Sequence, residues 1–251
     1  MSGKSAALQG DRVALIEFPA PLPWRVALGP GAAGGAGDLV IACASIGHDP
    51  LRPPVPEFLR HAMAGGRRAI FVTDESRSWG QTPGLTDALQ EALAAARRAG
   101  PLGRVLVLGQ SMGAVVALKA AAMVGADAVL AFGPQSGLGA LAPPGERRWQ
   151  PWAGRLRDES VTVPAGVAVT LFHGLRDDTA QARGFPARRG LDHLLFPGQD
   201  HSGLCPHLSG RGALGGLIEA ALAGDRRRLL RIATSAGGVR RDRLWRDQEP
   251  R

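Results

Sequence analysis

A serine between two glycines is the side chain of this sequence best placed to act as a nucleophile. It lies in Gly109-Gln110-Ser111-Met112-Gly113, after an apolar, β-branched run at residues 104–108 and before an Ala-rich helical pattern at residues 114–124. A strand that turns sharply into a helix at Gly-x-Ser-x-Gly holds the serine hydroxyl out at the carboxyl end of the strand. The two glycines let neighbouring backbones approach where a Cβ would clash. The pattern predicts a nucleophilic Ser111; the alternative is a small residue in a tight turn without chemistry.

Two loops farther along the chain carry the acid and the base that a nucleophilic serine needs. Residues 167–172 resemble a strand, and His173, Asp177 and Asp178 follow it. Residues 191–196 resemble another strand, and His201 lies in the loop after it. Because the carboxyl ends of parallel strands meet at one edge of a sheet, we expect both loops beside Ser111. Asp177 is the preferred acid, Asp178 remains the alternative, and His201 is the preferred base.

These residues resemble the α/β-hydrolase superfamily, over roughly residues 38–222. The His-Gly-x-x-Asp run that begins at His173 and the Gly-x-x-His run that ends at His201 are characteristic of that superfamily. The resemblance implies an α/β-hydrolase fold with Ser111 as nucleophile, Asp177 as acid and His201 as general base. It also implies a serine hydrolase that cleaves a carboxylic ester or thioester through an acyl-enzyme. An acyltransferase would use the same triad, and a non-catalytic binding module would keep only the scaffold.

The resemblance further implies two backbone N–H groups that hold the oxyanion. One belongs to Met112, the residue after the nucleophile. The other is expected from Ile46 or Gly47, in the loop after the apolar run at residues 38–45. This loop lacks the His-Gly pair that opens the oxyanion loop in many members, so the choice between Ile46 and Gly47 stays open.

Strand-like and helix-like segments alternate along the chain, which predicts a mostly parallel central sheet with helices on both faces. The first two strands are joined by a short Pro-rich turn, so we expect an antiparallel start. The expected strands are residues 12–18, 24–28, 38–45, 68–72, 104–108, 128–132, 167–172 and 191–196. The expected helices are residues 56–64, 85–99, 114–124 and 212–222.

Candidate substrate-binding residues lie in three segments near the same edge. His48 follows the proposed oxyanion residues, while Arg77 and Trp79 follow the strand at residues 68–72. Arg77 would hold an anionic group and Trp79 would pack on a ring or a sugar; a solvated loop is the alternative. Trp149 and Trp152 lie in the irregular stretch 134–164, where this fold carries a lid. About thirty residues form only a small lid, so we expect a fairly open pocket.

The length of 251 residues fits one domain, which we place at residues 1–225, followed by an Arg-rich tail at 226–251. Nine arginines against four acidic residues between 225 and 251 carry +5 of the net charge of +8. The positive charge therefore belongs mainly to the tail, which is expected to begin as a helix at residues 226–232 and then to fray. In the binding-module alternative this tail would dock an acidic partner. With no tyrosine and few aromatic residues, the chain offers little to stack on bases, so nucleic-acid binding is not expected.

Metal, cofactor and membrane signals are weak. Asp200, His201, Cys205 and His207 lie close in sequence, but without a paired Cys-x-x-Cys or His-Glu-x-x-His we expect no metal site. No cofactor motif stands out, and none is expected. An apolar run of about 18 residues and an export-type leader are not found, so we expect a cytoplasmic protein.

Overall fold

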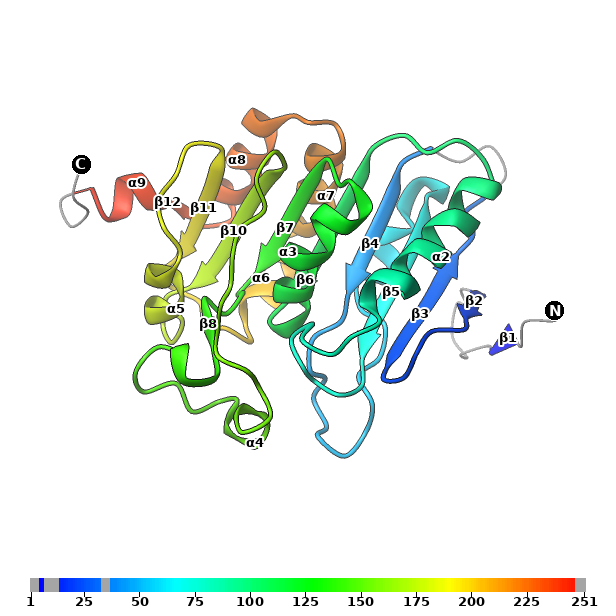
Figure 1. Ribbon diagram of the computed structural model, residues 1–251. Coiled ribbons are helices and arrows are strands. Elements are labelled where there is room, and N and C mark those ends of the chain that lie inside the picture. The colour runs from blue at the N-terminus through cyan, green and yellow to red at the C-terminus, as the bar shows by residue number, and fades with distance from the viewer. Residues whose placement is uncertain (1–4, 7–13, 33–36, 247–251) are drawn as a thin grey trace.

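A ten-stranded sheet runs through the molecule, and the computed structural model describes residues 5–6, 14–32 and 37–246 of the chain (Figure 1). The strand order is β1-β2-β3-β5-β4-β6-β7-β10-β11-β12. These strands are β1 (Ser5–Ala6), β2 (Leu15–Phe18), β3 (Trp24–Gly29), β4 (Leu39–Cys43), β5 (Arg68–Asp74), β6 (Val105–Gln110), β7 (Ala128–Phe132), β10 (Ala168–Gly174), β11 (Leu191–Phe196) and β12 (Val239–Arg240).

The six central strands, from β5 to β11, pair in parallel. They are the continuous apolar runs of the sequence, and a strand buried on both faces requires such a run. β4, β6 and β7 are buried along almost their whole length. The expected antiparallel start is present, because β3 pairs antiparallel with both β2 and β5. The first expected strand begins at Leu15, and residues 12 and 13 lie outside the described part of the chain.

Helices cover both faces of the sheet (Figure 1). On one face, α2 (Leu85–Arg98) and α3 (Met112–Val124) pack on the sheet in one large apolar cluster. On the other face lie α1 (Leu59–Ala62), α6 (Leu204–Gly210), α7 (Ala213–Leu222) and α8 (Arg226–Ser235). Because α2 presents a single apolar stripe while α3 is buried almost all round, α3 is the central helix of its layer. The predicted α/β class, with a mostly parallel sheet covered on both faces, is confirmed.

The segment 134–164 lies beyond the edge of the sheet at which the parallel strands end (Figure 1). It contains the antiparallel pair of β8 (Gly137–Leu138) and β9 (Glu159–Ser160) and the short helix α4 (Gln150–Ala153). We call residues 134–164 the covering segment. Two short helices that were not predicted, α5 (Thr179–Gly184) and α6, follow β10 and β11.

The Arg-rich end is part of the fold as far as residue 246, so the expectation that it frays after residue 232 is wrong. α8 continues to Ser235, β12 adds to the sheet beside β11, and α9 (Arg241–Leu244) follows. Leu229 and Ala233 join the apolar cluster under α7, and Trp245 is buried in a small cluster of its own. Residues 247–251 lie outside the described chain.

The arginines of this end contact groups of the same molecule. Arg226 forms two hydrogen bonds with the Asp192 carboxylate, at 2.7 and 2.6 Å. Arg241 donates to the carbonyl oxygen of Phe185 and stacks on the Trp245 ring. These contacts join the end of the chain to β11 and to the loop before it. Among the described residues, the helices are all too short or too polar to cross a membrane.

Candidate active site

The serine that follows β6 stands in a strained turn between the strand and α3. Ser111 has φ 56° and ψ −124°, a backbone conformation that residues other than glycine rarely adopt. A Cβ on Gly113 would overlap the carbonyl oxygen of Cys43, and one on Gly109 would overlap that of Gly113. Only glycine therefore allows α3 to begin this close to β4 and β6. The strained turn places Ser111 at the carboxyl end of the sheet.

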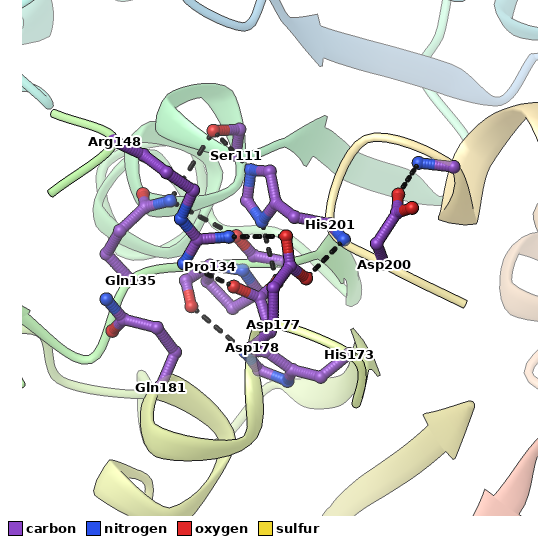
Figure 2. A network of polar contacts seen from close by, with 12 residues as sticks. Ser111, Pro134, Gln135, Arg148, His173, Asp177, Asp178, Gln181, Asp200 and His201 are labelled. Carbon is purple, nitrogen blue, oxygen red and sulfur yellow. Dashed lines mark hydrogen bonds and ion pairs between the residues drawn. The ribbon is translucent and has the colours of Figure 1, made fainter. Parts of the chain in front are cut away.

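His201, 90 residues later, reaches the serine from the loop after β11. Its Nε2 lies 2.9 Å from Ser111 Oγ, and its Nδ1 lies 2.6 Å from Oδ2 of Asp178 (Figure 2). The side chains of His201 and Asp178 are 5% and 1% exposed. The structure thus brings a hydroxyl, an imidazole and a buried carboxylate into one hydrogen-bonded chain.

The preference for Asp177 as the carboxylate on the imidazole is wrong, and the alternative, Asp178, holds that place. Asp177 Oδ1 instead accepts a hydrogen bond from the backbone N–H of His201 at 2.7 Å. The turn after β10 closes with a hydrogen bond from Asp178 N to the carbonyl of Gly174 at 3.1 Å, just before α5 begins. This turn directs Asp178 inward and leaves Asp177 at the rim, with 40% of its side chain exposed. Both carboxylates position His201, one through its ring and one through its backbone.

Opposing effects set the charge of Asp178. Burial raises the pKa of its carboxyl, but the hydrogen bond from His201, the electrostatic interactions with His201 and His173 and, last, the positive charge of Arg148 together outweigh burial. The pKa of Asp178 is therefore below its ordinary value, and the group is a carboxylate at neutral pH. A buried carboxylate on Nδ1 leaves Nε2 of His201 free to accept a proton from Ser111.

Comparison with known proteins gives the same architecture. No protein-family model and no curated protein sequence matches the chain. Among solved structures, an α/β serine hydrolase without a lid from Xanthomonas campestris has a TM-score of 0.51 and 17% identity, over 83% of this chain and 94% of its own. The 2,6-dihydroxy-pseudo-oxynicotine hydrolase has a TM-score of 0.57 and 14% identity, over 88% and 68%. The capsule O-acetyltransferase of Neisseria meningitidis serogroup A has a TM-score of 0.55 and 11% identity, over 82% and 95%. The chain has the α/β-hydrolase fold.

In the α/β-hydrolase fold the oxyanion hole is formed by the amide of the residue after the nucleophile and by an amide of an early strand-to-helix loop; in this chain the corresponding loop follows β4. Met112 begins α3, so its N–H has no partner within the helix. In the loop after β4, Gly47 N donates to Ser45 Oγ at 3.2 Å and Ser45 N donates to Glu57 at 3.1 Å. The N–H of Ile46 makes no hydrogen bond within the described residues. Of the two predicted loop donors, Ile46 is therefore the one whose N–H is not engaged.

Arg77 does not have the anion-holding role that the sequence predicted. Its guanidinium donates to the carbonyls of Ile46 at 2.9 Å, Asp49 at 3.0 Å and Arg52 at 2.6 Å. The irregular loop after β4 leaves these carbonyls without strand partners, and a buried guanidinium satisfies several at once. Arg77 therefore fixes the loop that carries Ile46.

Of the three predicted tryptophans, one packs against the His201 ring and the other two contact residues outside the triad. Trp79 is fully buried, and its Nε1 donates to Gln135 Oε1 at 2.7 Å. Trp149 packs edge-on against the His201 ring, with 5.2 Å between the centroids, and contacts Trp79 at 5.8 Å. Trp152 lies half-buried near the Arg77 guanidinium, 5.6 Å from it. His48 is exposed in the loop after β4, where it interacts electrostatically with the carboxyl of Glu57.

The three side chains of the site are covered, whereas the small size of the predicted lid had indicated a fairly open pocket. Ser111 is 4% exposed and His201 is 5% exposed, and Trp149 from the covering segment lies against the imidazole. A cavity of about 520 Å³ is present elsewhere, between β7, β10 and α7, with Val129, Val169 and Ala221 among its lining residues. None of the three triad residues lines this cavity, so the hydrogen-bonded triad, and not cavity size, locates the site.

Two residues of the covering segment reach the triad and were not predicted. Gln135 Nε2 lies 3.4 Å from Ser111 Oγ, and Trp79 fixes which end of the amide faces the serine. Arg148 Nη2 donates to Asp178 Oδ1 at 2.8 Å (Figure 2). Gln135 follows the end of β7 by three residues, so the predicted strand at residues 128–132 could have placed it at the same edge of the sheet as Ser111. Arg148 lies deep in an irregular segment, and no sequence pattern identifies it.

A pair of buried histidines supports the same loops. His173 Nε2 lies 3.0 Å from the carbonyl oxygen of Pro134, and His173 Nδ1 lies 2.8 Å from His193 Nε2. A carbonyl only accepts, so Nε2 of His173 carries the proton and Nδ1 accepts from His193. Burial lowers the pKa of His173 to about 4 and that of His193 well below its ordinary value. Both rings are neutral near neutral pH and hold Pro134, next to Gln135, in place.

The cluster considered for a metal has other partners. Asp200 Oδ1 accepts from Gly203 N at 2.6 Å, and His207 Nε2 lies 2.7 Å from the carbonyl oxygen of Ala236. Throughout the ranges that the structure describes, no three His, Cys, Asp or Glu side chains are grouped so that they could hold a metal ion.

Proposed function

We propose that this protein is a serine hydrolase that cleaves a carboxylic ester or thioester through an acyl-enzyme on Ser111. One observation carries the proposal: Ser111 Oγ, His201 and the buried Asp178 carboxylate form a continuous hydrogen-bonded chain, with contacts of 2.9 and 2.6 Å. A nucleophile, a base and an orienting carboxylate in this geometry are the parts that acyl transfer requires.

In the first half-reaction, Ser111 Oγ attacks the acyl carbon while His201 Nε2 takes its proton. Asp178 stabilises the imidazolium and keeps the ring oriented. The imidazolium then gives its proton to the departing alcohol or thiol, which leaves an ester on Ser111. In the second half-reaction His201 takes a proton from water, the hydroxide attacks the ester, and the proton returns to Ser111.

The oxyanion formed in both steps is held by the amides of Met112 and Ile46 in this proposal. The N–H of Met112 lies at the start of α3, and Arg77 holds the loop next to the Ile46 N–H by donating to the carbonyl oxygen of Ile46. Removal of one such donor typically lowers turnover about 10²–10³-fold. Because Gly47 N donates to Ser45 Oγ, Gly47 is the weaker candidate.

The cover over the triad limits how a substrate enters. Trp149 rests on the edge of the His201 ring, so the acyl group must displace this indole or slide beneath it. The Nε1 of Trp149 is buried without a hydrogen-bond partner among the described residues, so moving the ring breaks no hydrogen bond of this group. We propose that Trp149 lines the acyl site and that the substrate is modest in size or presents one narrow end.

Labelling with a fluorophosphonate tests the proposal, because such reagents phosphonylate a serine only when a base activates it. We expect the label on Ser111, located by peptide mass spectrometry, and no label in Ser111→Ala. Ser209→Ala, which changes an exposed serine of α6, should label at the wild-type rate. A folded protein that takes no label, or that takes it elsewhere, would contradict the proposal.

The same acyl-enzyme also permits transfer to an alcohol, and the covered triad favours this as the second candidate. Ser111 and His201 are at most 5% exposed, so bulk water has limited access to an acyl group on the serine. The fold does not decide the acceptor. The ratio of acid to new ester, measured with added alcohols, distinguishes the two acceptors. Hydrolysis that persists at high alcohol concentration supports a hydrolase, whereas complete conversion to a new ester supports a transferase.

A further inference from the structure

The covering segment supplies one side chain to each member of the triad. Gln135 Nε2 lies 3.4 Å from Ser111 Oγ, and the Trp149 ring lies 5.2 Å from the His201 ring. Arg148 Nη2 lies 2.8 Å from Asp178 Oδ1. Of these three contacts, the one made by Arg148 joins opposite charges at short range.

Arg148 is held in place on several sides. Its Nη1 lies 3.3 Å from Asp177 Oδ2 (Figure 2). Its Nε donates to Glu146 Oε1 at 2.9 Å. Glu146 in turn accepts from Gln181 Nε2, on α5, at 3.1 Å. A planar guanidinium that contacts three carboxylates has little freedom to rotate. The position of Arg148 is therefore set by the acid loop and by its own segment together.

The two oxygens of Asp178 have separate partners. Oδ2 takes the hydrogen bond from His201 Nδ1, and Oδ1 takes the one from Arg148. A carboxylate is planar, so a partner that fixes one oxygen also fixes the direction of the other. Arg148 thereby determines where Asp178 presents Oδ2 to the imidazole.

We propose that Arg148 is a positioning residue of the triad, which aligns the Asp178 carboxylate with His201 and whose positive charge opposes protonation of His201. This inference rests on the proposed function of the triad.

The other charged groups near the pair do not replace Arg148. The Asp177 carboxylate faces the backbone of His201, and Glu146 faces Arg148. Burial raises the pKa of Glu146, but its hydrogen bonds to Arg148 and Gln181 outweigh burial and lower it to about 2. His173 is neutral near neutral pH, and Arg241 lies beyond it, against His193. In the part of the chain that the structure describes, Arg148 is the arginine that forms an ion pair with Asp178.

The pH dependence of kcat/KM for an aryl ester tests the inference, because its acid limb follows protonation of His201 in the free enzyme. In Arg148→Gln the acid limb should move to higher pH by about 0.5–1 unit, since removal of a cation favours the imidazolium. Arg148→Lys keeps the charge and should hold the limb near its wild-type position. Arg147→Gln removes an exposed charge from the same segment and should not move the limb.

A folded Arg148→Gln variant whose acid limb coincides with that of wild type, or lies at lower pH, would overturn the inference. So would an equal shift in Arg147→Gln, because the effect would then belong to net charge. The titration of the His201 ring by NMR in the same variants gives this shift without substrate. If wild type takes no fluorophosphonate label, the proposed function fails, while the NMR shift still decides the role of Arg148.

Discussion

Asp177 and Asp178 are neighbours in sequence with different surroundings. The side chain of Asp178 is 1% exposed and lies between His201 and Arg148, whereas that of Asp177 is 40% exposed and accepts from a backbone N–H. The buried carboxylate controls the orientation of the imidazole, and the exposed one controls the position of the loop that carries it. In the proposed reaction, only the first of these roles would act on the proton that moves.

Substitution of the two aspartates separates these roles. Asp178→Asn should lower kcat for an aryl ester about 10⁴-fold, because the amide favours the wrong imidazole tautomer. Asp177→Asn keeps an oxygen that accepts from His201 N and should cost less than about tenfold. Steady-state kinetics of both variants checks the assignment. The reverse order of effects would return the acid role to Asp177.

At the residue scale the sequence predicted that Ser111, His201 and one of two adjacent aspartates lie together, and the structure places Ser111, His201 and Asp178 in one hydrogen-bonded chain. The choice between Asp177 and Asp178 depends on how the turn after β10 closes on Gly174, and the sequence does not encode that turn in a recognisable motif. Arg77 was misjudged for a related reason: its carbonyl partners belong to a loop whose path is set by tertiary packing.

At the scale of elements, α3 approaches β4 and β6 so closely that Gly109 and Gly113 are required in the turn around Ser111, which we call the elbow. A Cβ on Gly113 would overlap the backbone carbonyls of Cys43 and Ala44. Both belong to a buried strand and its exit, so neither can move without disturbing the sheet.

Gly113→Ala should lower the free energy of unfolding by more than about 3 kcal/mol or prevent folding. Gly210→Ala is the matched control: this glycine ends α6 with open space around its Cβ position, and the change should be neutral or stabilising by up to about 1 kcal/mol. Urea unfolding of both variants measures the difference. Equal stability of the two would contradict the close packing at the elbow.

The long elements could be predicted from the sequence because their apolar residues follow clear periods. The strand Ala128–Phe132 and the strand Leu191–Phe196 begin and end where expected. The covering segment and α5 were not resolved from the sequence, since they are short and owe their shape to contacts such as that of Gln181 with Ser136 N at 2.8 Å.

At the scale of the whole molecule, the C-terminal elements close one end of the sheet. Trp245 is 6% exposed and is stacked by Arg183 and Arg241, at 4.6 and 5.0 Å from its ring. The arginines that looked like a charged tail in the sequence therefore serve partly as packing groups, through their stems and their planar ends.

Trp245→Ala should lower the free energy of unfolding by about 3 kcal/mol, because it empties a packed site at the end of the sheet. Arg243→Ala, an exposed position on the same short helix α9, should change it by less than about 0.5 kcal/mol. Thermal or urea unfolding distinguishes the two. If Trp245→Ala were as stable as wild type, the C-terminal elements would not be part of the folded domain.

The buried histidines make the stability of the whole molecule depend on pH. The pKa of His173 is about 4 when folded against an ordinary value of 6.5, so the unfolded chain binds more protons between these values. The contribution of the neutral His173 ring to the free energy of unfolding is fully present above about pH 6.5 and is lost as the pH decreases toward 4. Glu146, whose pKa falls from 4.5 to about 2, loses its contribution only at lower pH.

From about pH 7.5 to 5.5 the free energy of unfolding should therefore fall by about 1.4 kcal/mol for each fully neutral buried imidazole. His173→Asn, which retains a donor for the Pro134 carbonyl, should remove roughly half of this dependence. Urea unfolding at the two pH values gives both slopes. A wild-type stability that rises on acidification through this range would show that the pair is charged in the fold.

The central claim is that Ser111, His201 and Asp178 act as one unit that forms an ester on Ser111. Mass spectrometry of protein quenched within the first turnovers of p-nitrophenyl acetate tests it most directly. We predict an acetyl adduct on the peptide that contains Ser111, which His201→Gln and Asp178→Asn both suppress by orders of magnitude. Turnover without any adduct, undiminished in Ser111→Ala, would contradict the account.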